Sequence, residues 1–110
     1  MATDAQAALA AALDRMWLVH LPELQERVDI LEASAQAFAA GRLSVDRQQA
    51  AQAAAHKLAG VLGTFGLTRG TVLARELEIM YSRQDDPESG SAERLATIAA
   101  ELRSLIENHK

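Results

Sequence analysis

The sequence predicts an all-α fold, an antiparallel up-and-down four-helix bundle with an additional N-terminal helix. Strong helix formers such as Ala, Leu, Glu, Gln and Arg dominate its 110 residues, and aromatic residues make up only 4%. No segment alternates apolar and polar residues as a strand does, whereas apolar residues recur at helical spacing. We expect residues 1–110 to form a single domain, because a chain of this length supports one hydrophobic core.

Pro22 separates the first two predicted helices. Residues 4–19 are rich in Ala and amphipathic, and residues 22–40 carry apolar residues spaced alternately by four and three, as in a helix of a bundle. Pro22 suits a first helical turn, but one long helix kinked at this residue also fits the pattern. Gly41 is well placed to end the second helix. The apolar residues are Leu9, Leu13, Met16 and Trp17 in the first segment and Leu24, Val28, Leu31, Ala35 and Phe38 in the second.

The third predicted helix begins after Ser44, whose side chain can cap it. Asp46 lies in its first turn, where a carboxylate interacts favourably with the helix dipole. The helix runs to the neighbourhood of Thr64, and Gly66 is expected to end it.

Two more helices complete the predicted bundle. One covers residues 68–83, and the polar run 84–91 is expected to be a loop in which Ser89 or Ser91 caps the last helix. Short connections between helices of similar length favour antiparallel neighbours. The inward residues are Leu73, Leu77 and Met80 in the fourth helix and Leu95, Ile98, Ala99, Leu102, Leu105 and Ile106 in the last.

His56 lies in the stretch AAHKLAGVLGTFGL, residues 54–67, which also carries three evenly spaced glycines. On a helical wheel, the core-facing arc of this stretch lies opposite His56. Two of the glycines share the side of His56, where each costs about 1 kcal/mol relative to Ala in a helix interior. The missing side chains indicate that another surface approaches the histidine, or that a neighbouring helix packs closely there. The side of His56 holds Gln52, Ala53, Ala59, Gly60 and Gly63, and the core-facing arc holds Ala54, Leu58, Val61, Leu62 and Phe65.

Several kinds of active site lack their sequence signals. A metal site in a bundle favours Glu-x-x-His pairs, and no Glu stands three residues before any histidine. The glycine-rich stretch lacks the spacing and the Lys-Ser/Thr of a phosphate-binding loop, so we do not expect the chain to bind ATP and phosphorylate itself. No elbow motif is present to hold a catalytic serine. We therefore expect no metal site and no autonomous enzyme, with His20 and His109 as surface residues.

Composition limits the expected partners and location. The formal net charge is −4 and the Lys and Arg residues are scattered, which argues against a nucleic-acid partner. No apolar run approaches the roughly 20 residues of a membrane span. The chain has no cysteine, and its first residues lack the early basic charge of a signal peptide. We expect a cytoplasmic protein without a membrane partner, and the start at Met1 and the polar tail favour a separate protein over a domain of a larger hybrid kinase.

The run HKLAG at 56–60, the glycines that follow it and Leu77-Glu78 resemble the histidine-containing phosphotransfer (HPt) domain of two-component phosphorelays. The resemblance covers nearly the whole chain and implies a four-helix bundle with an additional N-terminal helix. It implies that His56 accepts a phosphoryl group and that Lys57 helps to hold the phosphoryl oxygens. It further implies that Gly60 leaves room for a partner and that Glu78 orients the imidazole.

The same resemblance implies a response-regulator receiver domain and a hybrid sensor histidine kinase as partners. The receiver would supply the metal ion and the aspartate, so we expect no cofactor in this chain, which would act as a monomer. Many similar domains carry Lys three residues after the histidine, where this chain has Ala59. Lys57, with Arg75 as a second candidate, would then neutralise the phosphoryl group. The alternative is an adaptor or dimerisation domain that keeps a degenerate HPt fold without phosphorylation.

Overall fold

A computed structural model of the chain describes residues 3–82 and 90–109. It contains four helices, α1 (Asp4–Ala39), α2 (Val45–Thr64), α3 (Thr68–Ser82) and α4 (Ser91–Glu107), and no strand among the described residues. The predicted all-α class is confirmed. Of the loop expected over 84–91, residues 84–89 lie outside the described residues.

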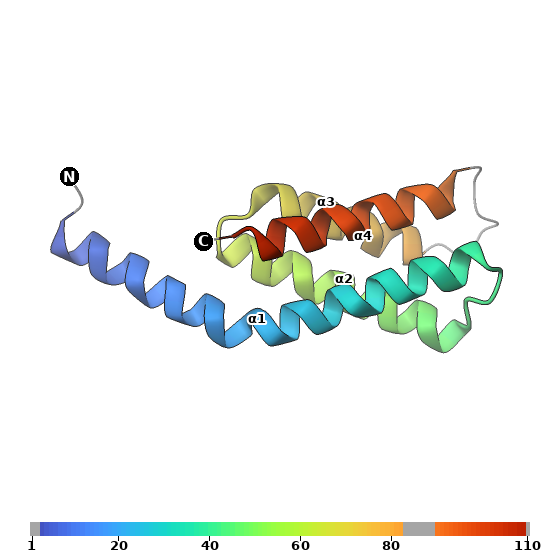
Figure 1. Cartoon of the computed structure of the whole chain (residues 1–110), viewed down its shortest axis with the longest axis horizontal. Helices are drawn as coiled ribbons and strands as arrows, with labels where there is room; N and C mark the ends of the chain where they lie inside the picture. Colours follow the sequence, from blue (N-terminus) through green and yellow to red (C-terminus); the bar gives the residue numbers. More distant parts are fainter. Residues whose placement is uncertain (1–2, 83–89, 110) are drawn as a thin grey trace.

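α1 is a single helix of 36 residues that contains Pro22. The expected separation into an N-terminal helix and a second helix is therefore wrong, and the alternative of one long helix is confirmed. Figure 1 shows that α1 changes direction between its blue and cyan parts. Proline removes one backbone hydrogen bond and bends a helix, but good helix formers on both sides allow the helix to continue. Thr3 and Gln6 form a capping box at its start.

The four helices close into a bundle in which each packs against the next along the chain (Figure 1). α4 also packs against α1, which completes the ring of contacts. The bundle-facing stripe of α1, with Leu24, Val28 and Leu31, is buried as its spacing predicted. The largest fully buried side chains of the other helices are Leu58, Leu62, Leu73, Leu77, Ile98, Leu102 and Ile106.

The helix ends follow local sequence signals except at α4. The Ser44 hydroxyl accepts a hydrogen bond of 3.1 Å from the backbone N–H of Arg47, as expected of a cap. Gly41 and Gly66 have positive φ angles of 69° and 76°, which suits residues that end a helix. The expected serine cap of the last helix is wrong: Gly90 is the cap residue and has no side chain that could accept a hydrogen bond, and Ser91 already lies inside the helix.

A close approach of α3 to α2 positions the residues around His56. A Cβ atom on Gly70 would lie 2.9 Å from Leu62 Cδ1, so glycine lets the two helices pack at this distance. One residue further along, the Thr71 hydroxyl donates a hydrogen bond of 3.2 Å to the backbone carbonyl of Ala59. This contact fixes α3 beside the central turns of α2.

Candidate functional site

His56 projects into solvent from the middle of α2. Its side chain is 74% exposed, whereas that of Glu78, on α3, is 29% exposed. His56 Nδ1 lies 2.7 Å from Glu78 Oε2, although 22 positions separate the two residues in the sequence. The structure thus places His56 beside Glu78, the residue expected to orient its imidazole.

The contact with Glu78 determines which imidazole nitrogen is free. An ionised carboxylate can only accept hydrogen bonds, so Nδ1 must carry the proton and donate it to Oε2. In the neutral imidazole the other nitrogen, Nε2, then has a lone pair. A solvent-exposed nitrogen with a free lone pair can act as a nucleophile.

Part of the expected docking face lies around His56 on α2. Ala53 and Gly60 are exposed, and Gln52 is half-buried. A Cβ atom on Gly60 would meet nothing within 4 Å, so no neighbouring helix explains this glycine. Gly60 therefore leaves open space one turn after the imidazole.

Two other residues of that face lie against α3. Ala59 is only 5% exposed, so its expected place on the solvent side is wrong. Gly63 is exposed, but a Cβ atom there would lie 3.3 Å from the Thr71 hydroxyl. α2 has neighbours on two sides, α1 and α3, and its buried arc is therefore wider than a single core-facing stripe. For Gly63 the alternative of close helix packing has direct support.

Each of the two helices that form the His56–Glu78 pair carries an exposed cation close to it in the sequence. Lys57 is exposed and lies about 100° around α2 from the histidine. Arg75 is exposed on α3, one turn before Glu78. With Ala59 buried, Lys57 is the cation of α2 nearest to His56, and Arg75 is the cation of α3 nearest to Glu78.

Two apolar residues near this site did not emerge from the sequence reasoning. Val72 and Ile79 are large exposed hydrophobic residues on α3. They stand seven positions apart, with Arg75 between them, and share the outward face of the helix. Their outward direction became clear only once the faces of α3 toward α2 and α4 were known.

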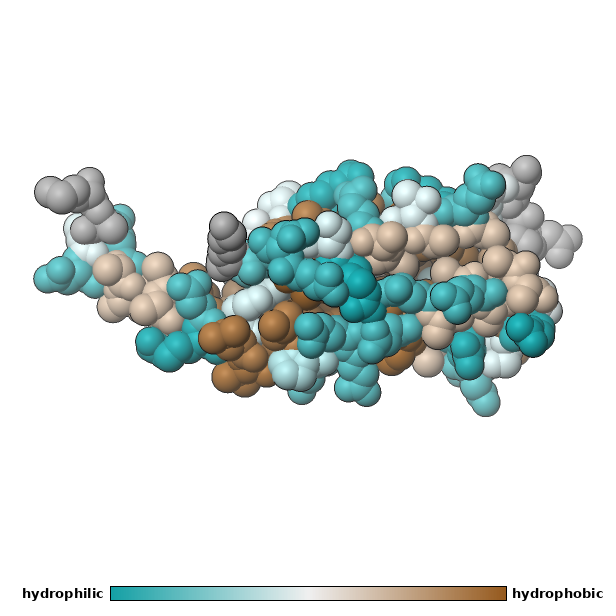
Figure 2. Space-filling model, in the orientation of Figure 1, coloured by the Kyte–Doolittle hydropathy of each residue, from teal (hydrophilic) through white to brown (hydrophobic). Residues whose placement is uncertain are grey.

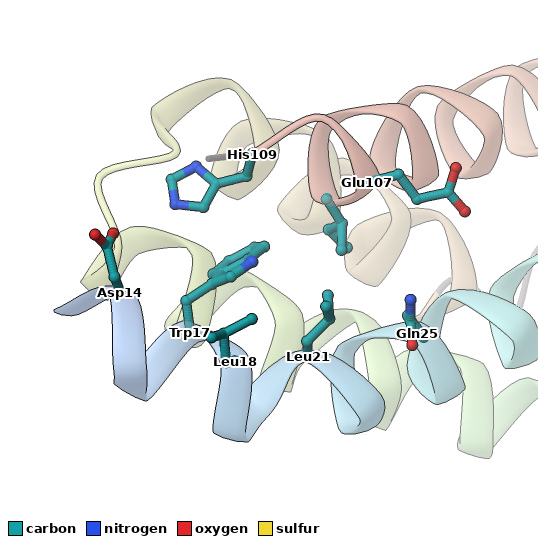
Figure 3. A pocket seen from close by; sticks show the side chains of 8 residues that line it. Asp14, Trp17, Leu18, Leu21, Gln25, Glu107 and His109 are labelled. Atoms are coloured by element: carbon teal, nitrogen blue, oxygen red, sulfur yellow. The ribbon is translucent and has the colours of Figure 1, made fainter. Parts of the chain in front are cut away.

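A groove between α1 and the C-terminal end of α4 is separate from the His56 site (Figure 3). His109, expected at the surface, is half-buried there and packs on Trp17 with ring centroids 4.2 Å apart. Figure 3 shows the Trp17 side chain between α1 and the end of α4. The groove is lined by Asp14, Trp17, Leu18, Leu21, Gln25, Ile106, Glu107 and His109.

The described residues carry neither a metal-binding cluster nor a membrane-spanning helix. Within residues 3–82 and 90–109, no three His, Cys, Asp or Glu side chains gather in a way that could hold a metal ion. In the same part of the chain, no helix has the length and apolar character needed to cross a bilayer.

Comparisons with known proteins add an independent observation. A family model described as the Hpt domain matches residues 15–109. Protein RcaC from Microchaete diplosiphon is 30% identical over 106 residues, which are 96% of this chain and 16% of RcaC. This chain thus spans less than a fifth of that relative's length. No solved structure matches the chain significantly.

Proposed function

The chain belongs to the Hpt domain family, and we propose that it carries a phosphoryl group on His56 between the partners of a two-component phosphorelay. Hpt domains are phosphotransfer modules and not autonomous kinases. The observation that best supports His56 as the acceptor is its exposed imidazole, held through Nδ1 by Glu78 at 2.7 Å.

The proposed step transfers the phosphoryl group between two side chains. The lone pair of His56 Nε2 attacks the phosphorus of a phosphorylated aspartate, a P–N bond forms, and the P–O bond to the aspartate breaks to release a carboxylate. The Nδ1 proton stays in its hydrogen bond with Glu78 throughout. Since the phosphorylated imidazole with this proton is positively charged, the carboxylate of Glu78 also stabilises the product.

Lys57 is the proposed cation for the phosphoryl oxygens, and Arg75 is a second candidate. Both side chains are exposed; Lys57 follows His56 directly on α2, and Arg75 precedes Glu78 by one turn on α3. A cation near the phosphoryl oxygens reduces the repulsion between them and the approaching partner. The open space at Gly60 would admit that partner to within reach of Nε2.

The proposed partners are a response-regulator receiver domain and a hybrid sensor histidine kinase. Gln52, Ala53 and Gly60 form the proposed docking face around His56, while the burial of Ala59 removes it from that face. Gly63 is kept as a residue that lets α3 pack close to α2.

An adaptor or dimerisation domain with the same fold is the alternative. The two functions are separated by measuring binding and transfer on the same pair of proteins. We expect a phosphorylated receiver domain from the same organism to lose its phosphoryl group to this chain. Binding without transfer, across the receivers of that organism, would favour the adaptor.

A further inference from the structure

The beginning of α1 projects beyond the bundle (Figure 1). At about 1.5 Å per residue, its 36 residues extend along the whole 53 Å long axis of the molecule. Residues 3–11 are exposed, and 12 and 13 are half-buried. The family match begins at residue 15. Residues 4–14, here called the N-terminal arm, precede the matched range.

The arm and the turn that follows it carry a second apolar stripe on α1. Its five residues are separated by four, three, four and three positions, which is the spacing of a coiled-coil seam. Leu9 is 62% exposed and Val19 is 76% exposed, and Met16 is exposed as well. We call this stripe the outer seam; it consists of Ala5, Leu9, Ala12, Met16 and Val19.

The outer seam is not a continuation of the stripe that packs in the bundle. On a helical wheel it lies about 107° from the direction of Leu24, Val28 and Leu31. Figure 2 shows hydrophobic side chains on α1 where the projecting part meets the bundle, and the exposed large hydrophobic residues of this part of the helix are Met16, Leu18 and Val19. The bundle of this chain therefore cannot cover the outer seam, and an exposed seam of this kind is typical of a protein interface.

The pattern of side-chain sizes in the outer seam indicates what covers it. The large residues Leu9 and Met16 alternate with the small residues Ala5 and Ala12. Two copies of the seam in antiparallel orientation therefore place large side chains opposite small ones. In an antiparallel pair, Leu9 of one chain would pack on Ala12 of the other, and Met16 on Ala5. With a two-fold axis between residues 10 and 11, Asp14 lies opposite Ala7 and Arg15 lies opposite Gln6, so the pairing brings no like charges together.

We propose that the outer seam pairs with the outer seam of a second copy of this chain, in antiparallel orientation. This departs from the monomer expected from the sequence. The pairing leaves the phosphotransfer site free, because Trp17, near the end of the seam, contacts Phe65, the residue that follows α2. His56 lies nine positions earlier, about 13 Å back along that helix. The proposed dimer therefore does not depend on the proposed phosphotransfer, and each can be tested without the other.

Sedimentation of the full chain over a range of concentrations tests the proposal. We expect a dimer whose fraction rises with protein concentration. Leu9→Glu should raise the dissociation constant of this dimer at least tenfold, because it places a charge in the seam. Leu18→Glu is the matched control, since Leu18 is exposed on the groove side of the same helix (Figure 3). Circular dichroism should show the helix content unchanged in both variants, because neither side chain is buried. A monomer at all concentrations, or an equal effect of the two substitutions, would overturn the proposal.

Disulfide cross-linking tests the orientation, because the natural chain has no cysteine. A mixture of Ala5→Cys and Met16→Cys chains should form a mixed disulfide under mild oxidation, while each variant alone should not cross-link efficiently. If each variant cross-links efficiently with itself and the mixture contains no mixed disulfide, the antiparallel arrangement is contradicted.

Discussion

The carboxylate of Glu78 on α3 lies 2.7 Å from Nδ1 of His56 on α2. This pairing connects the packing of two helices to the chemistry of one nitrogen atom. α3 reaches this position because Gly70 and Thr71 allow and fix its close approach to α2. Substitutions in this pair should therefore change the tautomer and orientation of the imidazole and leave the fold intact.

Two substitutions of Glu78 separate its hydrogen bond from its charge. Glu78→Gln keeps an acceptor for Nδ1–H but removes the negative charge, and Glu78→Ala removes both. We expect phosphotransfer to slow roughly 10- to 100-fold in the alanine variant, and less in the glutamine variant. Nitrogen NMR of His56 should show the Nδ1–H tautomer in the wild type and a mixture in Glu78→Ala.

Glu93→Gln is the control for these variants, because Glu93 is exposed in the first turn of α4. It should transfer phosphate as the wild type does. Wild-type rates in Glu78→Ala would remove Glu78 from the mechanism.

Gly60→Gln should keep the fold and slow transfer. A side chain at this position meets open space, and replacing glycine inside a helix stabilises it by up to about 1 kcal/mol. The same side chain would obstruct a partner that approaches His56. Thermal unfolding and the transfer rate from a phosphorylated receiver check the two parts of this prediction.

Ala100→Gln is a matched substitution on the exposed surface of α4, a helix that packs on α1 and α3. We expect it to leave transfer unchanged. If Gly60→Gln transfers as fast as Ala100→Gln, the face around Gly60 is not where the partner binds.

Tyr81 offers a spectroscopic test of the core, because it is the chain's single tyrosine. Burial raises the pKa of Tyr81 to about 12, from an ordinary value of 10.0. The neutral phenol is therefore favoured in the folded state, and its contribution to stability is lost as the pH rises from about 10 through 12. Tyrosinate absorbance of the folded protein should appear near pH 12; a transition near pH 10 would contradict the burial of this side chain.

Tyr81→Phe should be tolerated. Among the described atoms, the buried Tyr81 hydroxyl has no hydrogen-bond partner, so its removal leaves no new unpaired group. We expect the free energy of unfolding to stay within about 1 kcal/mol of the wild-type value, or to increase. Urea unfolding at neutral pH measures it.

Acid should weaken the contact between α3 and α4. A hydrogen bond from Arg94, 2.7 Å from Glu76, lowers the pKa of the Glu76 carboxyl. A lowered pKa in the folded state stabilises the fold above the unfolded pKa, and this stabilisation is lost as the pH falls through the folded value. Between about pH 5 and pH 3, unfolding midpoints should fall less steeply in Glu76→Gln than in the wild type.

Arg94→Gln should reproduce the shallower pH dependence, because it removes the other partner. Adding it to Glu76→Gln should then cause little further change. A wild-type slope in both single variants would show that the pair does not contribute.

Local signals in the sequence were sufficient for much of the fold. Ser44 caps a helix through its hydroxyl, and Gly41 ends a helix through a positive φ angle. Both effects involve only residues that are close in the sequence, so the sequence alone was enough to predict them. The regular spacing of Leu24, Val28 and Leu31 correctly predicted a buried stripe. The outward direction of His56 followed from the same helical periodicity.

Other features depend on how the helices pack. Pro22 is compatible with a helix start and with a bend, and only the structure distinguishes them. The sequence predicts an exposed Ala59 because a helical wheel with one buried side leaves this residue outside. In the structure α3 covers a second side of α2, and Ala59 is buried there. The close contact of Gly70 with Leu62 joins two helices and has no local signature.

The most direct test of the account is to locate the phosphoryl group after transfer from a phosphorylated receiver domain. We predict an acid-labile, alkali-stable phosphate on the wild type that disappears in His56→Gln. His20→Gln and His109→Gln serve as controls and should be phosphorylated as the wild type is. A phosphate that persists in His56→Gln, or that is lost in His20→Gln or His109→Gln instead, would contradict the assignment of His56 as the phosphoryl acceptor.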